Sequence, residues 1–176
     1  MTQSPTRPHA SPMSNRSARR RAEAAMFDGT LALAARGAQG RGAKVVSAML
    51  AFTAKLVRAY RRAGTEPLRG EALGKEWQRL MPNPKVMPIT HVEGDTAYGE
   101  IHVRCPLRGT GDVHACHRLM AYDRALMRPA GARFVVLESQ AEPGVEHCRI
   151  AIRPADLPAD DLVPAIIRAD QLTKRA

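Results

Sequence analysis

The sequence predicts an α+β domain in which N-terminal helices pack with an antiparallel sheet that carries one inserted helix. Apolar side chains recur at helical spacing up to about residue 81, and from Val86 the period falls to two, which is typical of strands. Helical spacing returns over residues 113–128, before a second pair of alternating segments. A run of helices followed by strands on both sides of one helix indicates the α+β class.

Charge and size limit the classes of function. The 176 residues suffice for one domain with tails, and the net charge is +10. About half of this excess lies in residues 1–22, which carry five arginines and no acidic residue. No zinc-finger spacing, aromatic RNA-recognition motif or Gly-rich clamp accompanies the charge. We therefore expect a solubilising tail and no dedicated nucleic-acid function.

Hydropathy and cysteine usage predict a cytoplasmic protein without a membrane span. The most apolar segment, 43–63, is interrupted by Lys55, Arg58, Arg61 and Arg62, and no uninterrupted apolar segment resembles a secretory signal. The three cysteines are an odd number. Without an export signal, reduced thiols or a metal site explain them better than disulfides do.

The N-terminal half is predicted to be helical after a disordered basic tail over residues 1–16, whose composition cannot bury enough apolar surface to fold. Helices are expected over 17–36, 43–63 and 71–81, each ended by glycine or proline. In the second helix, an apolar stripe is expected to face the core, with the basic side chains on the other side. This stripe comprises Val46, Met49, Leu50, Thr53, Leu56, Val57 and Tyr60.

The C-terminal half alternates between strands and helix. Strands are expected over 86–92, 97–105, 133–140 and 146–153, with a helix over 113–128 that Asp112 caps and a short helix over 160–168. The single domain therefore spans 17–155, with a helical part over 17–81, and the sheet with its cysteine-bearing helix occupies 85–154. Residues 156–176 are expected to form a C-terminal tail.

All three cysteines lie on faces that the periodicities turn inward. Cys105 ends the second strand, Cys116 lies in the first turn of the inserted helix, and Cys148 lies early in the last strand. Three neighbouring thiols can hold a soft metal such as zinc, with a histidine or carboxylate as fourth ligand. Alternatively, Cys116 is a nucleophile, because a helix start and a nearby histidine lower the pKa of a thiol. The third interpretation is three small buried hydrophobes.

Asp123 places a carboxylate on the otherwise apolar stripe of the inserted helix. Burial of a lone carboxylate costs free energy, so the group needs a partner, a metal ion or a raised pKa. Asp123 is therefore a functional candidate. The alternative is an aspartate at the edge of the stripe, bonded to an arginine or a backbone amide.

These residues follow an order that resembles a known family. A Cys-Pro pair closes a strand, a helix carries cysteine in its first turn and aspartate further along, and a Gly-x-x-Phe-Val-Val strand precedes a Gly-Val-Glu-His-Cys-Arg-Ile strand. Over about residues 85–154 this order resembles the L-2-amino-thiazoline-4-carboxylic acid hydrolase-like family. More distantly, it is similar to the 4-vinyl-reductase-type small-molecule-binding domains. The resemblance implies the fold of TRAPP-complex components, with helices against an antiparallel sheet.

The resemblance also implies a metal site, with one departure. Zinc sites of the 4-vinyl-reductase-type domains use an acid and three cysteines, and Cys116 and Cys148 match two of these cysteines. The third position is Gln140, which is not a thiolate, and Cys105 matches the hydrolase-like pattern instead. A zinc cofactor on Cys105, Cys116 and Cys148 would take its carboxylate from Glu100 or Asp123.

The implied activity is the hydrolytic opening of a thiazoline ring. It gives Cys116 the role of nucleophile or ligand, Asp123 general acid–base catalysis and His117 proton transfer. Arg104 or Arg108 would bind the substrate carboxylate, because a guanidinium suits that geometry.

Two other functions stay open beside the hydrolase. One is a non-enzymatic module that senses a small molecule or a metal. The other is an assembly protein that forms a homodimer through its N-terminal helices, which an exposed apolar stripe on the 43–63 helix would favour.

Overall fold

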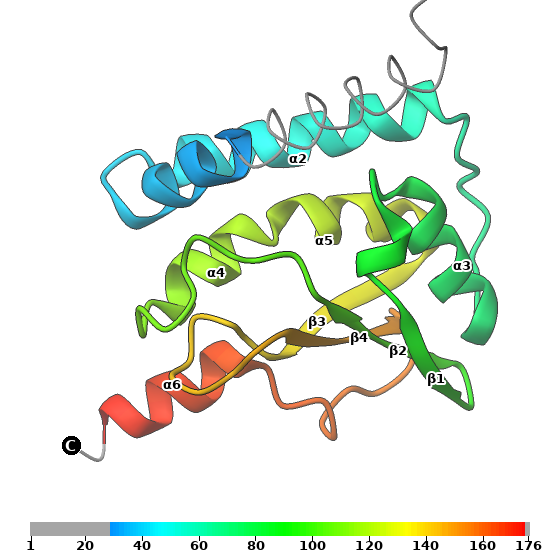
Figure 1. Ribbon diagram of the computed structural model, residues 1–176. Helices are drawn as coiled ribbons and strands as arrows, with labels where there is room; N and C mark the ends of the chain where they lie inside the picture. Colours follow the sequence, from blue (N-terminus) through cyan, green and yellow to red (C-terminus); the bar gives the residue numbers. More distant parts are fainter. Residues whose placement is uncertain (1–28, 175–176) are drawn as a thin grey trace, which may run out of the picture.

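A computed structural model describes residues 29–174, and it confirms the α+β class (Figure 1). A helical segment over 29–39 precedes α2 and α3, and the sheet and the remaining helices follow. The expected tail over 1–16 and the start of the first helix lie outside the described residues. The elements are α2 (Ala43–Tyr60), α3 (Gly70–Leu80), η1 (Pro84–Val86), β1 (Ile89–Glu93), β2 (Thr96–Ile101), α4 (Val113–Leu119), α5 (Ala121–Met127), η2 (Arg128–Ala130), β3 (Ala132–Glu138), β4 (Cys148–Pro154) and α6 (Ala165–Thr173).

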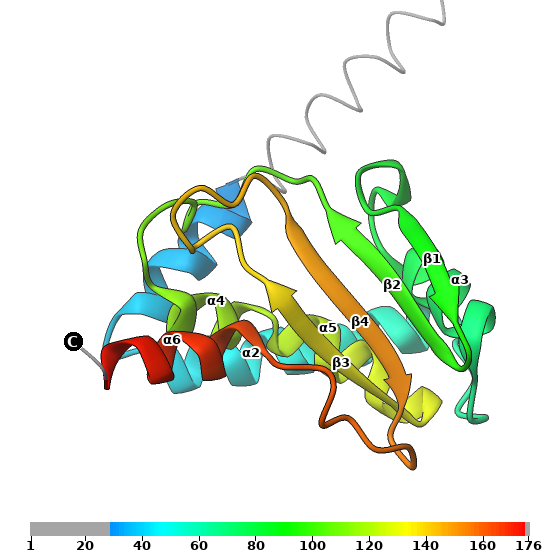
Figure 2. The same cartoon turned by 90° about the horizontal axis from the view of Figure 1, so that it is seen from below.

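The sheet has four strands in the order β1-β2-β4-β3, and every neighbouring pair is antiparallel. Helices α4 and α5 lie against one face of the sheet, and α2 lies outside them (Figure 1). Figure 2 shows the four strands side by side, with α6 near β3 at one end. None of the helices within residues 29–174 is long and apolar enough to cross a membrane.

The core lies between the sheet and the helices. Alternate residues of β4 point into it, as strand geometry requires, so that Cys148, Ile150 and Ile152 are buried on the helix side. Helix α3 approaches the sheet closely because Gly74 has no side chain: a Cβ atom there would lie 2.9 Å from Ile89 Cγ1. The indole of Trp77 is fully buried in the same layer.

The predicted 97–105 strand ends four residues early, at Ile101. Beyond it, the backbone bonds to a side chain instead of a strand: the Gln140 amide donates to the carbonyls of Ile101 and Val103. The Gln140 carbonyl accepts the amide of Cys105. Cys105 therefore lies in a loop and is half-buried, which corrects the prediction that it ends a strand on the buried face.

The predicted 113–128 helix is two helices, α4 and α5, which meet at Met120. The start was predicted correctly, since the Asp112 carboxylate accepts the Ala115 amide at 2.8 Å. Asp123, on α5, is directed at α3, where its carboxylate accepts a hydrogen bond from Trp77.

Helix α2 carries apolar side chains on two sides, whereas one side was predicted. Val46, Leu50 and Val57 pack against the core, but Met49 and Leu56 of the same predicted stripe are exposed. Arg58, predicted to lie on the polar side, is buried. Its guanidinium donates to the carbonyl of Leu126 at 2.7 Å and to that of Gly64.

Residues 155–174 pack on the domain, where a C-terminal tail was expected. Leu162 is buried against Val135 and Ala151 on the face of the sheet opposite the helices. Helix α6 begins at Ala165, later than the predicted 160–168 helix, and contacts α4. The apolar side of α6 packs on the domain, because Ala165 is buried in the main core and Ile166 packs against it.

Candidate functional site

Cys116, in the first turn of α4, and Cys148, at the start of β4, are buried neighbours whose thiols interact. The Cys148 thiol and the Ser139 hydroxyl lie close enough to Cys116 to stabilise its thiolate. This stabilisation lowers the pKa of Cys116, although burial acts in the opposite direction. The interaction of the Cys148 thiol with Cys116, together with burial, raises the pKa of Cys148.

Cys116 also lines a cavity of about 210 Å³ between α4, α5, β3 and the start of α6. His117, Arg124, Arg133 and Ser139 contribute polar groups to its wall. Partial burial lowers the pKa of His117, and the positive charge of Arg124 lowers it further. His117 is thus a neutral imidazole near pH 7 and can accept a proton. The rest of the wall is mostly apolar, including Val113, Phe134, Val136 and Ile166.

Arg124 is a half-buried cation in this wall, and the sequence reasoning did not select it. Its Nη2 donates to the His117 carbonyl at 2.7 Å, and burial lowers its pKa. A guanidinium in an apolar wall can bind a carboxylate. Its only signal in the sequence is that it follows Asp123 on the helix, and this does not distinguish it from an exposed arginine.

Asp123 does not line either cavity that we identify. It is buried, and its Oδ1 accepts the Trp77 indole N–H at 3.0 Å. Burial raises the pKa of Asp123 to about 6. The structure therefore explains how the buried carboxylate is accommodated, by an indole and a raised pKa, and does not bring it into the cavity with Cys116 and His117.

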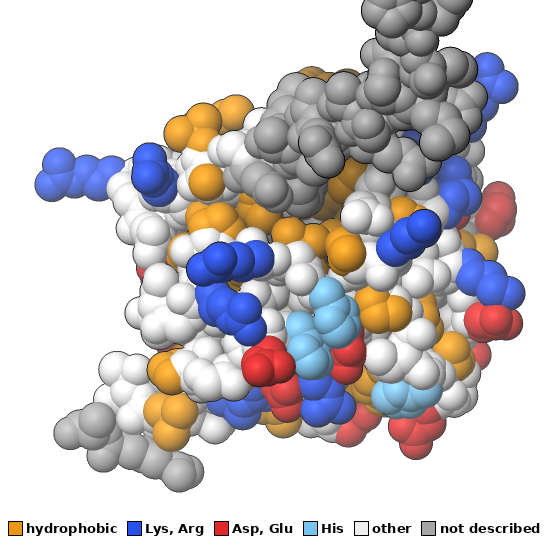
Figure 3. Space-filling view, in the orientation of Figure 1, with side chains coloured by type: hydrophobic (Ala, Val, Ile, Leu, Met, Phe, Trp, Pro, Cys, Tyr) orange, Lys and Arg blue, Asp and Glu red, His pale blue; other side chains and the backbone are white. Residues whose placement is uncertain are grey.

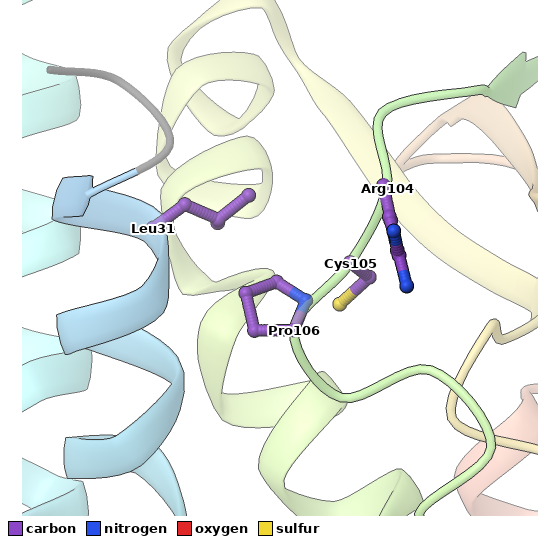
Figure 4. Close-up of a pocket in the computed structure, with 4 residues that line it drawn as sticks. All are labelled: Leu31, Arg104, Cys105 and Pro106. Carbon is purple, nitrogen blue, oxygen red and sulfur yellow. The ribbon is translucent and has the colours of Figure 1, made fainter. Parts of the chain in front are cut away.

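Cys105 and Arg104 line a second cavity, of about 270 Å³, with Pro106 and Leu31. Figure 4 shows Leu31, from the helical segment 29–39, facing the loop that carries the other three side chains. Burial raises the pKa of Cys105, so that its thiol stays protonated at neutral pH. The two cavities share no lining residue, which separates Cys105 and Arg104 from Cys116 and His117.

Arg108, the other predicted substrate ligand, lines neither cavity. It is exposed, and its Nη2 donates to the Glu146 carbonyl at 2.8 Å. It fixes the segment before β4 to the loop that follows β2.

One group of side chains could hold a metal ion, and it is not the predicted cysteine set. The ligand atoms of Glu100, His102 and His147 all lie within 4.8 Å of one another. Within residues 29–174 this is the one such group of three His, Cys, Asp or Glu side chains. Of its members, only Glu100 was considered from the sequence. For His102 and His147, the only indication in the sequence was their position on the outward face of neighbouring predicted strands.

Comparison of the chain with family models, curated proteins and solved structures finds no match. The resemblance to the thiazoline-carboxylate hydrolase-like family therefore depends on the residues quoted for it.

Proposed function

We propose that the protein is a small hydrolase that opens a C=N-containing heterocycle of the 2-amino-thiazoline-4-carboxylate kind. The observation that carries this proposal is the cavity in which a thiol of lowered pKa, a neutral imidazole and a half-buried guanidinium lie together. A cavity of about 210 Å³ suits a small substrate. Its apolar wall would strengthen the attraction between Arg124 and a substrate carboxylate.

In the proposed reaction, one water molecule is added and the ring opens. The carbon of the C=N bond is attacked either by water, which loses its proton to the neutral His117, or by the Cys116 thiolate. The carbon–sulfur bond of the ring then breaks, its sulfur takes a proton, and the product carries a free thiol. When Cys116 attacks, water releases the adduct from it, so that both routes give the same products.

Two of the roles expected from the sequence change in this proposal. Arg124 replaces Arg104 and Arg108 as the ligand of the substrate carboxylate, because it alone of the three lines the Cys116 cavity. Asp123 has no role at the substrate in this proposal, because its carboxylate lies outside the cavity and is bonded to Trp77.

The test is turnover of 2-amino-thiazoline-4-carboxylate by the reduced full-length protein, followed by the appearance of free thiol. We expect Cys116→Ser to abolish turnover. Cys105→Ser should retain it, and it is a matched control because Cys105 lines the other cavity. Arg124→Lys should raise KM more than it lowers kcat, since it keeps the charge and loses the planar guanidinium. Wild-type turnover in Cys116→Ser would contradict the proposal.

A non-enzymatic binding module is the alternative for the same cavity, and turnover separates the two functions. Zinc is the ion that we propose for the protein in either case. We assign it to imidazole and carboxylate ligands instead of the three cysteines, because only the former group lies within the reach of one ion.

A further inference from the structure

We infer that Glu100, His102 and His147 bind a divalent transition-metal ion of the zinc class on the outer face of the sheet, independently of the Cys116 cavity. Nε2 of His102 lies 2.8 Å from Glu100 Oε2, and Nε2 of His147 lies 3.4 Å from Glu100 Oε1. Both imidazoles thus direct the same nitrogen at one carboxylate. Two histidines and one glutamate are a ligand set that zinc uses in proteins.

The pairing of β2 with β4 brings the two histidines together. Ile101 lies opposite Cys148, so the next pair outward is His102 and His147, just beyond the ends of the strands. Their rings stack, with centroids 4.6 Å apart and planes inclined by 14°. Glu100 lies two residues before His102, and two residues along a strand return to the same face. Histidine side chains gathered beside acidic ones are visible on the molecular surface (Figure 3).

Hydrogen bonds fix the backbone around each of the two histidines. The amide of His102 donates to the Val86 carbonyl at 2.8 Å. The buried Gln140 amide binds the carbonyls on both sides of His102, and Arg108 binds the carbonyl of Glu146, next to His147. A ligand set held in this way loses little freedom when an ion binds.

No arginine or lysine pairs with Glu100 among the ion pairs of residues 29–174. Arg149 lies opposite Glu100 in the β2–β4 register, but its guanidinium pairs with Glu138 on β3 at 3.1 Å. The carboxylate of Glu100 therefore pairs only with the two imidazoles among the described residues. A bound cation would neutralise it and would be bound by both rings at once.

The group is open to solvent, with side-chain exposures of 24% for Glu100, 34% for His147 and 44% for His102. An ion can therefore enter. Three protein ligands leave at least one coordination position for water or for an anionic ligand.

A matched control for the group exists elsewhere on the surface. His114 on α4 pairs with Asp170 on α6 through Nε2 and Oδ1, which are 2.9 Å apart. This pair has one imidazole and one carboxylate and lacks the second histidine. Two ligands without a third are not expected to hold a metal ion tightly. We therefore expect His114→Gln to leave the zinc affinity of the protein unchanged.

The first experiment is a calorimetric titration of the metal-free, reduced full-length protein with zinc. We expect one equivalent to bind. His102→Gln and His147→Gln should each weaken binding at least tenfold, with folding checked by circular dichroism. The inference is overturned if the His102→Gln/His147→Gln double variant binds zinc as tightly as the wild type.

The second experiment replaces zinc by cobalt(II), whose absorption reports its ligands. We expect no thiolate-to-cobalt charge-transfer band, and we expect Cys116→Ser to bind the ion normally. Binding that shows this band and disappears in Cys116→Ser would assign the metal to the cysteines and overturn the inference. Turnover by the metal-free protein is measured separately, so a failure of the metal site and a failure of the proposed hydrolase are distinguishable.

Discussion

At the scale of single residues, Asp123 is the most strongly perturbed carboxylate. Burial raises its pKa from 3.8 to about 6, and the hydrogen bond from Trp77 reduces the effect of burial. A group whose folded-state pKa is raised binds its proton more tightly in the folded state than in the unfolded chain. Its contribution to stability is therefore fully present below the unfolded pKa and is lost as pH rises through about 6.

We predict that Asp123→Asn removes this pH dependence. The amide stays neutral, and its oxygen can still accept the Trp77 N–H. The free energy of unfolding of the variant relative to the wild type should rise between pH 4 and pH 7, by an amount on the order of 3 kcal/mol. Urea unfolding at a series of pH values measures it. Asp160→Asn, at an exposed position, is the control, and parallel curves for Asp123→Asn and wild type would contradict the prediction.

The sequence identified the residues with unusual chemistry better than it identified their neighbours. Asp123 stood out because it interrupts an apolar stripe, and it is indeed buried with a raised pKa. Its partner Trp77 lies 46 positions away in sequence, and periodicity cannot pair such distant side chains. The same limit hid Arg124 and the histidine pair, which only the tertiary contacts distinguish from surface residues.

At the scale of elements, α2 is the helix whose surface is least explained by the fold. Five apolar side chains with spacings of four, three, four and four residues stay exposed, with fractions of 63%, 63%, 61%, 54% and 87% for Val45, Met49, Phe52, Leu56 and Tyr60. This spacing is the one by which two helices pack along a seam. It favours the expectation that two copies of the chain associate through α2.

We predict a homodimer that this stripe holds together. Phe52→Ser should shift the protein toward the monomer, because it removes a large apolar side chain from the centre of the seam. Light scattering after size-exclusion chromatography, over a range of concentrations, measures the mass. Leu172→Ser on α6 is a matched control, since Leu172 is 67% exposed and lies outside the stripe. A wild-type protein that is monomeric throughout contradicts the prediction.

Element boundaries were predictable where local sequence sets them and were missed where a distant side chain does. Asp112 begins α4, and Pro82 follows the end of α3 closely, as local rules require. The early end of β2 depends instead on Gln140, a residue 39 positions after Ile101 that takes over the backbone hydrogen bonds. Likewise, which of the two apolar sides of α2 is buried depends on the side that α4 and α5 cover.

At the scale of the whole molecule, the 139–147 connection between β3 and β4 touches both candidate sites. Ser139 lines the cavity with Cys116, and His147 belongs to the metal-binding group. Between them, the Gln140 side chain is fully buried and bonds to three backbone groups, one at the end of β2 and two in the loop after it. The Gln140 amide therefore orders this loop, and the connection that carries it reaches both sites.

We predict that Gln140→Leu affects both sites at once. The apolar side chain leaves the Cys105 amide and two carbonyls without partners, which destabilises the protein by about 2–4 kcal/mol. In the variant that stays folded, His102 loses its fixed position, and zinc affinity should fall about tenfold. The alkylation rate of Cys116 should rise, because the segment that carries Ser139 loosens over the thiol. Zinc titration and iodoacetamide kinetics measure the two effects.

The control for that experiment is Glu142→Gln, in the same connection. Glu142 pairs with Arg168 on α6 and accepts the Ser139 amide, so the variant loosens the connection without removing the bonds to the loop after β2. If the amide of Gln140 is the shared element, Glu142→Gln should leave zinc affinity unchanged while Gln140→Leu lowers it. Equal loss of affinity in both variants would mean that general loosening of the connection is responsible. Unchanged affinity in Gln140→Leu would mean that the metal-binding group is held by β2 and β4 alone.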